Sequence, residues 1–219
     1  MQPLTVIHEG HRYVVIDKPA GIAVEKHHNY DTVEARAQVQ WGRPRSPKTA
    51  YVGIVHRLDR PVSGCLLLAQ NKSTLRTLNQ AFADRRVDKT YLAMTEAPLP
   101  ADAGELRHYL LRDKFGRKAV AATRPLPGAK ESVLRYRRLP LAGRGWLYTV
   151  EPVTGRFHQI RVQLATAGAP IVGDALYGAR TPHTEHAIRL HAARLDFPDP
   201  LTGKSVSVSC APAWLPPDQ

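Results

Sequence analysis

The residues best suited to chemistry lie in one short polar loop, His56-Arg57-Leu58-Asp59-Arg60. An imidazole, two guanidiniums of arginine and one carboxylate stand there between the apolar runs Ile54–Val55 and Cys65–Ala69. Such runs predict two short buried strands. A polar loop between core strands is a place where a rigid scaffold presents reactive groups to a substrate. A charged hairpin turn without chemistry, begun at Asp59, explains the composition equally well.

Net charge is the strongest compositional signal. The 219 residues carry 31 Lys and Arg against 19 Asp and Glu, a formal net charge of +12, which indicates a polyanionic partner such as nucleic acid. Between Arg107 and Arg144, eleven basic residues against two acidic ones leave nine of those twelve charges. This concentration predicts a phosphate-binding surface. Its phosphate-contact candidates are Arg135, Arg137 and Arg138.

The remaining composition excludes several classes of protein. A hydrophobic content of 43% suits one well-filled core. No run reaches transmembrane length and the first residues lack a signal-peptide pattern, so we expect a cytoplasmic monomer with no membrane partner. Cys65 and Cys210 are not spaced as metal ligands and are interpreted as buried, reduced thiols. The stretch His183–His186 also lacks zinc-ligand spacing, so we expect no metal. The sequence has no Gly-rich phosphate loop, so we expect no nucleotide cofactor.

The elements that must position the polar loop follow from periodicity and turn residues. Leu75, Leu78 and Phe82 lie on one face of a predicted helix. Short turns between strands favour an α+β domain with a mixed, mostly antiparallel sheet. Strands are expected over Arg12–Asp17, Asp88–Thr95, Glu105–Leu111, Lys118–Thr123, Glu131–Leu139, Trp146–Pro152, His186–Phe197 and Lys204–Ser209, and helices over Thr32–Trp41, Lys72–Asp84 and Arg156–Gly168.

The polar loop, followed by Ser63-Gly64 and a Leu-rich strand, resembles the active-site signature of the RluA-type RNA pseudouridine synthases. Ordered motifs are a more specific signal than any one of them, and the resemblance covers residues 6–212. Four further stretches match the family's pattern in order: Asp17–Gly21, Lys89–Tyr91, Thr154–Arg161, and Gly173–Gly178 with Leu190–Ala192.

Three positions depart from the family's usual residues. Val62 stands where threonine is usual, Gln70 where lysine is common and Asp199 where histidine is common. None of the three removes a group with a proposed chemical role, so they bear on loop rigidity or RNA contacts rather than on activity.

The resemblance implies an enzyme that isomerises uridine to pseudouridine in structured RNA, either ribosomal or transfer RNA, without a cofactor. It implies the fold of those synthases, with one catalytic domain over residues 1–219. Because the first expected strand begins at Arg12, we expect no N-terminal accessory RNA-binding domain. Asp59 is then the catalytic carboxylate. Tyr91 is the active-site aromatic that stacks on the uracil, and Arg161 is the cation that faces Asp59.

These residue types fit the reaction. Isomerisation breaks the N1–C1′ bond, turns the base and rejoins it through C5. Because C1′ becomes electron-poor, one carboxylate is required beside it, while the delocalised uracil anion can leave without a second one. Arg161 would hold Asp59 ionised, since a nearby opposite charge favours the charged form. Whether Asp59 attacks C1′ or removes a sugar proton stays open.

A further group of residues is expected at the RNA or in the loops that present it. His56 is interpreted as a hydrogen-bonding anchor, His158 as a cap or backbone-positioning residue, and Arg57 as filling the gap left by a flipped base. A surface ion pair is the alternative for Arg57. The whole group consists of His56, Arg57, Arg156, His158 and Gln159.

A non-catalytic RNA-binding module that keeps the same fold is the rival function. Without its motif, Tyr91 would be interpreted as a core tyrosine on a strand. Binding alone does not require Asp59, Tyr91 and Arg161 together, so their joint presence favours the enzyme.

Overall fold

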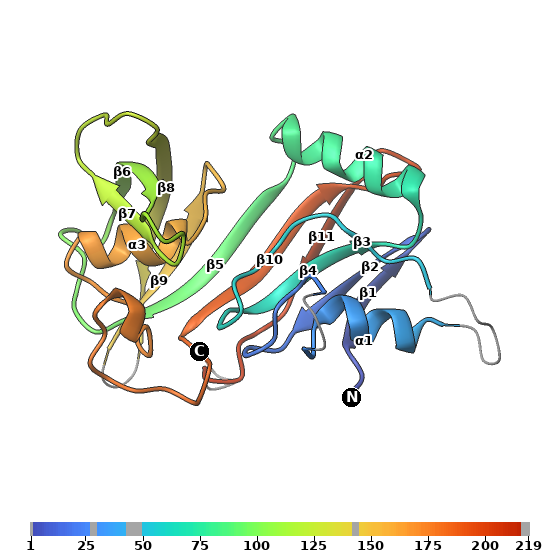
Figure 1. The fold of residues 1–219 in the computed structure, drawn as a ribbon, viewed down its shortest axis with the longest axis horizontal. Coiled ribbons are helices and arrows are strands. Elements are labelled where there is room, and N and C mark those ends of the chain that lie inside the picture. Colours follow the sequence, from blue (N-terminus) through green and yellow to red (C-terminus); the bar gives the residue numbers. More distant parts are fainter. Residues whose placement is uncertain (1, 27–29, 43–49, 142–144, 216–219) are drawn as a thin grey trace. The chain divides into compact units, whose positions relative to one another are not determined.

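The computed structural model describes residues 2–26, 30–42, 50–141 and 145–215. The chain divides into two compact units. The first runs to Lys89 and resumes from Ala192 to Ala213, and the second comprises Thr90–His191. Figure 1 shows the elements in chain order.

The first unit is a sheet with two helices. Its strands follow the order β1-β2-β4-β10-β11, and β3 pairs with β4. The pairs β1–β2, β2–β4, β3–β4 and β10–β11 are antiparallel. The elements are β1 (Thr5–Gly10), β2 (Tyr13–Lys18), α1 (Val33–Gln40), β3 (Gly53–Ile54), β4 (Ser63–Ala69), α2 (Lys72–Ala83), β10 (Leu190–Pro198) and β11 (Ser205–Ser209).

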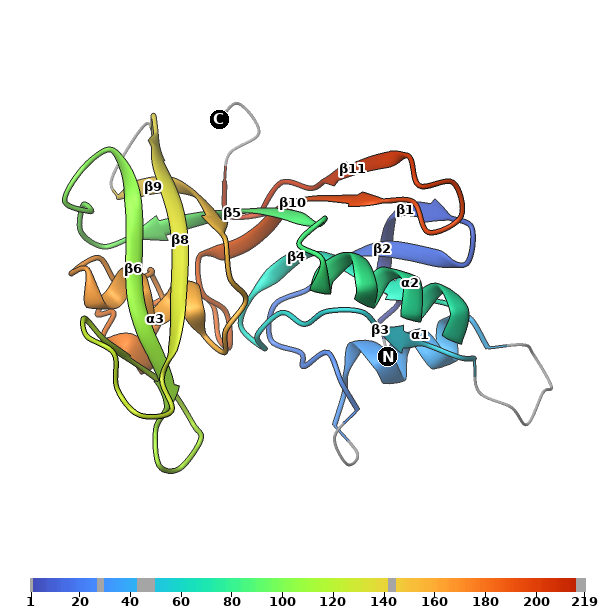
Figure 2. The same ribbon diagram turned by 90° about the horizontal axis from the view of Figure 1, so that it is seen from above.

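The core of the first unit forms where α2 packs on β2 and β4 (Figure 2). The antiparallel register places Val15 beside Leu67, and Leu78 of α2 joins both in one buried cluster. Burying an aliphatic side chain of this size contributes about 1.5–3 kcal/mol. The side chain of Asn71 accepts a hydrogen bond from the Thr74 N–H and so begins α2.

The second unit is a sheet in the order β5-β9-β8-β6-β7, covered by one helix. Its pairs are antiparallel. The elements are β5 (Asp88–Thr95), β6 (Ala103–Arg112), β7 (Ala119–Ala122), β8 (Lys130–Leu139), β9 (Trp146–Pro152), α3 (Gln159–Thr166) and the 3-10 turn η1 (Ala175–Tyr177).

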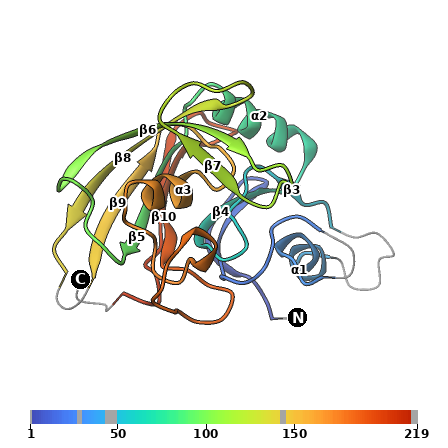
Figure 3. The same ribbon diagram turned by 60° about the vertical axis from the view of Figure 1, so that its left-hand side comes forward.

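The register of the second sheet separates two faces. Tyr91, Val150 and Tyr136 lie side by side in one row, and α3 covers one face of this sheet (Figure 3). There the buried amide of Gln163 on α3 donates to the carbonyls of Leu106 and Ser132. We term this the covered face. The opposite, outward face carries Glu105, Arg135, Arg137, Thr149 and Glu151.

The α+β class and most of the predicted elements are confirmed. Several boundaries differ by one or two residues, as does the strand expected over Ile54–Val55, which ends at Ile54. Two starts are further off: the helix expected from Arg156 begins at Gln159, and the strand expected from His186 begins at Leu190. His158 and His186 adopt positive φ values of 53° and 60°, a conformation that continues neither a helix nor a strand. The strand β1 was not expected at all.

Candidate active site

In the first unit, Asp59 begins a tight turn. Its carbonyl accepts a hydrogen bond from the Val62 N–H at 3.0 Å. Leu58 and Val62 on either side are buried, 6% and 2% exposed, so the backbone of the turn is fixed while Asp59 itself is only partly buried. An apolar Val62 suits this dry position, although the family's usual threonine would add a hydroxyl.

The buried side chain of Lys18 supports the turn at Asp59. Its side chain is 0% exposed, and its Nζ donates to the carbonyls of Pro19, Ile22 and Arg60 at 2.8, 2.9 and 3.3 Å. Burial lowers the pKa of Lys18 to about 7, against the opposing attraction of Asp59 and Asp17. Three carbonyls match the three N–H donors of an ammonium group. The motif that contains Lys18 thus supports the Asp59 loop directly.

Gly21 and Gly64 lie where other backbone segments contact the Asp59 loop closely. The Gly21 N–H donates to the Arg60 carbonyl at 2.8 Å, and the Arg60 Nε donates to the Gly21 carbonyl at 2.7 Å. Gly64 has φ +113°, and a Cβ there would overlap the backbone of Ala192. Glycine is therefore required where β4 leaves the loop.

His56 serves the loop as an acceptor. Its Nε2 accepts the Leu67 N–H at 3.0 Å, and its ring stacks on Phe82 with centroids 5.1 Å apart. Burial, with a smaller contribution from Lys89, lowers the pKa of His56 to about 3. A neutral ring whose Nε2 is occupied is unsuited to general acid catalysis near pH 7.

Arg57 points to solvent. Its side chain is 65% exposed and forms an ion pair with Glu25 at 3.1 Å. An exposed pair of this kind contributes about 0–1 kcal/mol, so it leaves Arg57 able to exchange its carboxylate partner for another group.

In the second unit, Arg161 is buried against a carboxylate that the sequence reasoning left without a role. Its Nε and Nη2 donate to the two oxygens of Asp174 at 2.7 and 2.8 Å. The two side chains are 5% and 2% exposed. A planar guanidinium suits this bidentate geometry, whereas a lysine ammonium does not. Tyr91 and Arg161 are thus carried by the sheet of the second unit and by the helix that covers it.

Aromatic rings complete the surroundings of Arg161. Its guanidinium lies 5.1 Å from the centroid of the Tyr177 ring, and the Tyr177 hydroxyl is hydrogen-bonded to Nδ1 of His158 at 2.9 Å. His158 occupies the N-cap position of α3 but makes no side-chain cap bond. Of its two expected roles, capping by the side chain is therefore wrong, because the ring turns to Tyr177 instead.

Gln159 fastens the loop before α3 to the sheet. Its Oε1 accepts from the Thr154 hydroxyl at 2.8 Å and the Arg156 N–H at 3.0 Å, and its Nε2 donates to the Val133 carbonyl at 3.0 Å. The side chain is 4% exposed. Both ends of the amide are engaged within the protein, so the structure gives Gln159 a loop-positioning role rather than an RNA contact. Arg156 is exposed, and no ion pair joins its side chain to another described residue.

The basic residues between Arg107 and Arg144 lie closer to acidic side chains in the structure than their sequence positions indicate. Arg135 lies 3.6 Å from Glu105, and Arg138 lies 3.1 Å from Asp102. Both acids precede the stretch in which the charges were counted. Only Arg137 of the three phosphate-contact candidates has no carboxylate within 4.0 Å among the described residues.

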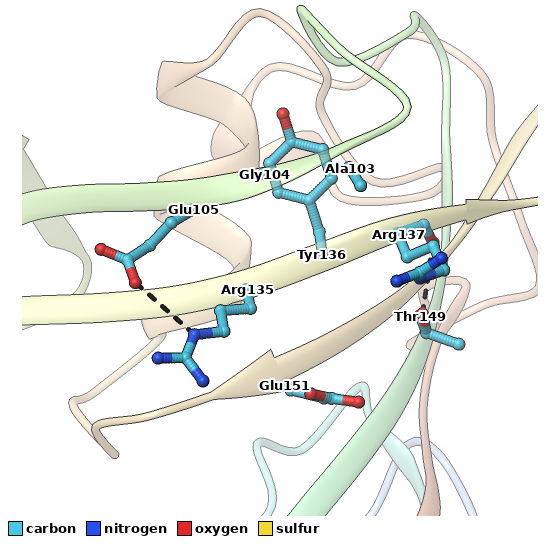
Figure 4. A pocket seen from close by; sticks show the side chains of 8 residues that line it. All are labelled: Ala103, Gly104, Glu105, Arg135, Tyr136, Arg137, Thr149 and Glu151. Atoms are coloured by element: carbon cyan, nitrogen blue, oxygen red, sulfur yellow. Dashed lines mark hydrogen bonds and ion pairs between the residues drawn. The ribbon is translucent and has the colours of Figure 1, made fainter.

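A shallow hollow of about 400 Å³ lies around Arg137 (Figure 4). The hydroxyl of Thr149 donates to the Arg137 carbonyl at its edge, and Glu105 and Glu151 add negative charge to the lining. Figure 4 shows Tyr136 projecting to the other side of the sheet from Glu105 and Arg135. The outward face is therefore of mixed charge, not uniformly basic.

The structure brings Tyr91 and Arg161 into one unit, while Asp59 belongs to the other. Sequence reasoning missed the parts played by Lys18 and Asp174. A signal was present, because each is a charged residue inside one of the motifs, Asp17–Gly21 and Gly173–Gly178. No described helix is long and apolar enough to cross a membrane.

Comparison with known proteins agrees with this picture. The sequence pattern that defines the RNA pseudouridylate synthase family matches residues 12–166. Ribosomal large subunit pseudouridine synthase D of Borreliella burgdorferi is 35% identical over 80% of this chain, which spans 55% of that protein. An uncharacterized RNA pseudouridine synthase of Haemophilus influenzae is 28% identical over 98% of this chain and 92% of its own length.

A solved structure extends the similarity to the fold. Human RNA pseudouridylate synthase domain containing 4 superposes with a TM-score of 0.74 and 25% sequence identity, covering 98% of this chain and 89% of that one.

Proposed function

Because this chain belongs to the RNA pseudouridylate synthase family, we propose that it converts uridine to pseudouridine in structured RNA. One observation carries the proposal: the family match spans residues 12–166, which contain Asp59, Tyr91 and Arg161. We further propose that both compact units serve one catalytic domain.

Asp59 supplies the negative charge beside C1′ while the glycosidic bond breaks and re-forms. The fixed turn and the buried Lys18 support this role, since a carboxylate on a rigid loop loses little entropy on meeting its substrate. Tyr91 stacks on the uracil, and its hydroxyl assists removal of the C5 proton.

Arg161 is assigned as the active-site cation that the family's pattern implies. The ion pair with Asp174 supports this assignment, because a guanidinium that is already clamped by one carboxylate is preorganised for a second contact. Arg57 fills the space left by the flipped base. Its high exposure and weak pair with Glu25 suit a side chain that must move.

Ribosomal RNA is the first substrate to test, because Borreliella burgdorferi and Vibrio cholerae relatives are named for the large ribosomal subunit. Transfer RNA is the second. We place the enzyme in the cytoplasm as a monomer that needs no cofactor or metal.

The test uses transcripts of large-subunit ribosomal RNA and of transfer RNA that contain 5-tritiated uridine. Isomerisation releases the tritium, and chemical mapping then locates the pseudouridine. Site-specific release by the purified chain supports the proposal. The contrary result is a chain that binds RNA but releases no tritium from any transcript or from total cellular RNA that lacks the modification. That result would favour the non-catalytic binding module.

A further inference from the structure

The two cysteines lie in contact although 145 positions separate them in sequence. The Sγ atoms of Cys65 and Cys210 are 3.3 Å apart, and no disulfide joins them. Cys65 lies on β4 and Cys210 directly follows β11, so both belong to the first unit.

The strand β10 contacts both cysteines. The Cys210 N–H donates to the Ala193 carbonyl at 3.0 Å. The same carbonyl lies 3.8 Å from the Cys65 Sγ, and the Ala192 carbonyl lies 3.9 Å from the Cys210 Sγ. A disulfide requires the sulfur atoms about 2.0 Å apart, so the two sulfur atoms have to approach each other further before a bond forms.

The two thiols differ in access to solvent. Cys65 is 1% exposed and belongs to the buried cluster around Leu67 and Phe197. Cys210 is only partly buried and packs at the edge of that cluster. A dissolved oxidant therefore reaches Cys210 first.

The contact also places Cys65 as the second reactant. The hydrogen bond between the two thiols, in which either sulfur can be the donor, lowers the pKa of Cys65, against the opposing effect of burial. A thiolate is the nucleophile in disulfide formation.

We propose that Cys65 and Cys210 form a reversible disulfide when the protein meets a hydroperoxide, with Cys210 oxidised first and Cys65 as the resolving thiol. The inference does not depend on the proposed function. It concerns a modification site, and it changes the interpretation of both residues as inert reduced thiols.

The reaction balances with hydrogen peroxide as the oxidant. The Cys210 thiolate attacks one peroxide oxygen, the O–O bond breaks, and hydroxide leaves and takes up the thiol proton as water. The resulting sulfenic acid is attacked at sulfur by Cys65. An S–S bond forms, the S–O bond breaks, and a second water leaves with the Cys65 proton. Two thiols lose two electrons, and one peroxide gains them.

The experiment treats the reduced full chain with hydrogen peroxide, then alkylates it in denaturant and measures the intact mass. The reduced protein should take up two alkyl groups. The oxidised protein should take up none and lose about 2 Da, the two thiol hydrogens. Dithiothreitol should restore both alkylations, and a peptide map should link the Cys65 and Cys210 peptides within one chain.

Matched variants assign the two roles. In Cys65→Ser, Cys210 should stop as a sulfenic acid that dimedone traps. In Cys210→Ser, Cys65 should stay alkylatable after the same treatment. If Cys65→Ser does not fold, Cys65→Ala serves in its place. The intact mass of the oxidised wild type shows whether the disulfide forms even without either variant.

Three results would overturn the proposal. In the first, the wild-type chain keeps two alkylatable thiols while Cys65→Ser is oxidised. In the second, the wild-type mass shows only added oxygen atoms and no loss of the two thiol hydrogens. In the third, the disulfide joins two chains rather than two cysteines of one chain.

Discussion

Among the described residues, each of the two units buries one lysine or arginine side chain, and the two units stabilise it in different ways. Within the described residues, Lys18 and Arg161 are the buried lysine and arginine. Lys18 is held by backbone carbonyls, whereas Arg161 is held by the carboxylate of Asp174. Carbonyl dipoles stabilise an ammonium without fixing its charge, while an ion pair locks both partners as ions. Lys18 can therefore lose its proton in the working pH range, and Arg161 cannot.

The exposed arginines of the outward face provide the contrast. Arg107 and Arg135 also contact carboxylates, yet their side chains are 53% and 68% exposed. Water screens such pairs, so each contributes little to the stability of the fold. Burial rather than the number of charges separates the cations that hold the fold from those that are available to a partner.

The largest expected effect comes from breaking the Arg161–Asp174 pair. Arg161→Met should lower the free energy of unfolding by about 3–5 kcal/mol, because Asp174 keeps a buried charge without its partner. The double variant Arg161→Met with Asp174→Asn should recover part of that loss. Urea unfolding of the three proteins measures this. A single variant as stable as the wild type would show that the pair is not a buried structural ion pair.

Arg161→Lys sharpens the same comparison. It keeps the charge but loses the bidentate contact, so it should fall between the wild type and Arg161→Met in stability and in single-turnover rate at saturating RNA. If Arg161→Met, once folded, reached the wild-type rate on saturating RNA, Arg161 would have no part in catalysis.

The second effect depends on pH. The pKa of Lys18 is about 7 in the folded protein, against the ordinary lysine value of 10.5 in the unfolded chain, so the unfolded chain binds more protons between these values. Stability of the wild type relative to Lys18→Met should therefore rise with pH from about 7 by roughly 1.4 kcal/mol per unit and level off near 10.5. Denaturant titrations at pH 7, 8 and 9 measure the slope. A constant difference across this range would contradict a buried, titrating Lys18.

The smallest effect is expected on the outward face. Neutralising Arg135, Arg137 and Arg138 together should weaken RNA binding and make it less salt-dependent, because fewer counterions are released. Arg137→Gln should account for most of the change, since Arg135 and Arg138 each have a carboxylate partner. Binding isotherms at several salt concentrations compare Arg137→Gln with Arg135→Gln. An unchanged salt slope in every variant would place the RNA elsewhere.

Periodicity predicted most strands and helices, because alternating and helical apolar patterns follow directly from burial on one face. It could not show which charges would be buried. Lys18 and Asp174 stand in turn-rich motifs where a charge is ordinarily solvated, and only the fold surrounds them. The linear charge count also failed for a physical reason: cross-strand pairing brings Glu105 beside Arg135 across 30 positions of sequence.

The central claim is that Asp59 supplies the charge for uridine isomerisation. Its most direct test is the single-turnover release of tritium from 5-tritiated uridine RNA by Asp59→Asn at saturating RNA. The variant should keep the fold and RNA binding, because Asp59 is a partly exposed turn residue. Pseudouridine formation should be abolished, since an amide of the same shape carries no negative charge. Release at a near wild-type rate would contradict the claim.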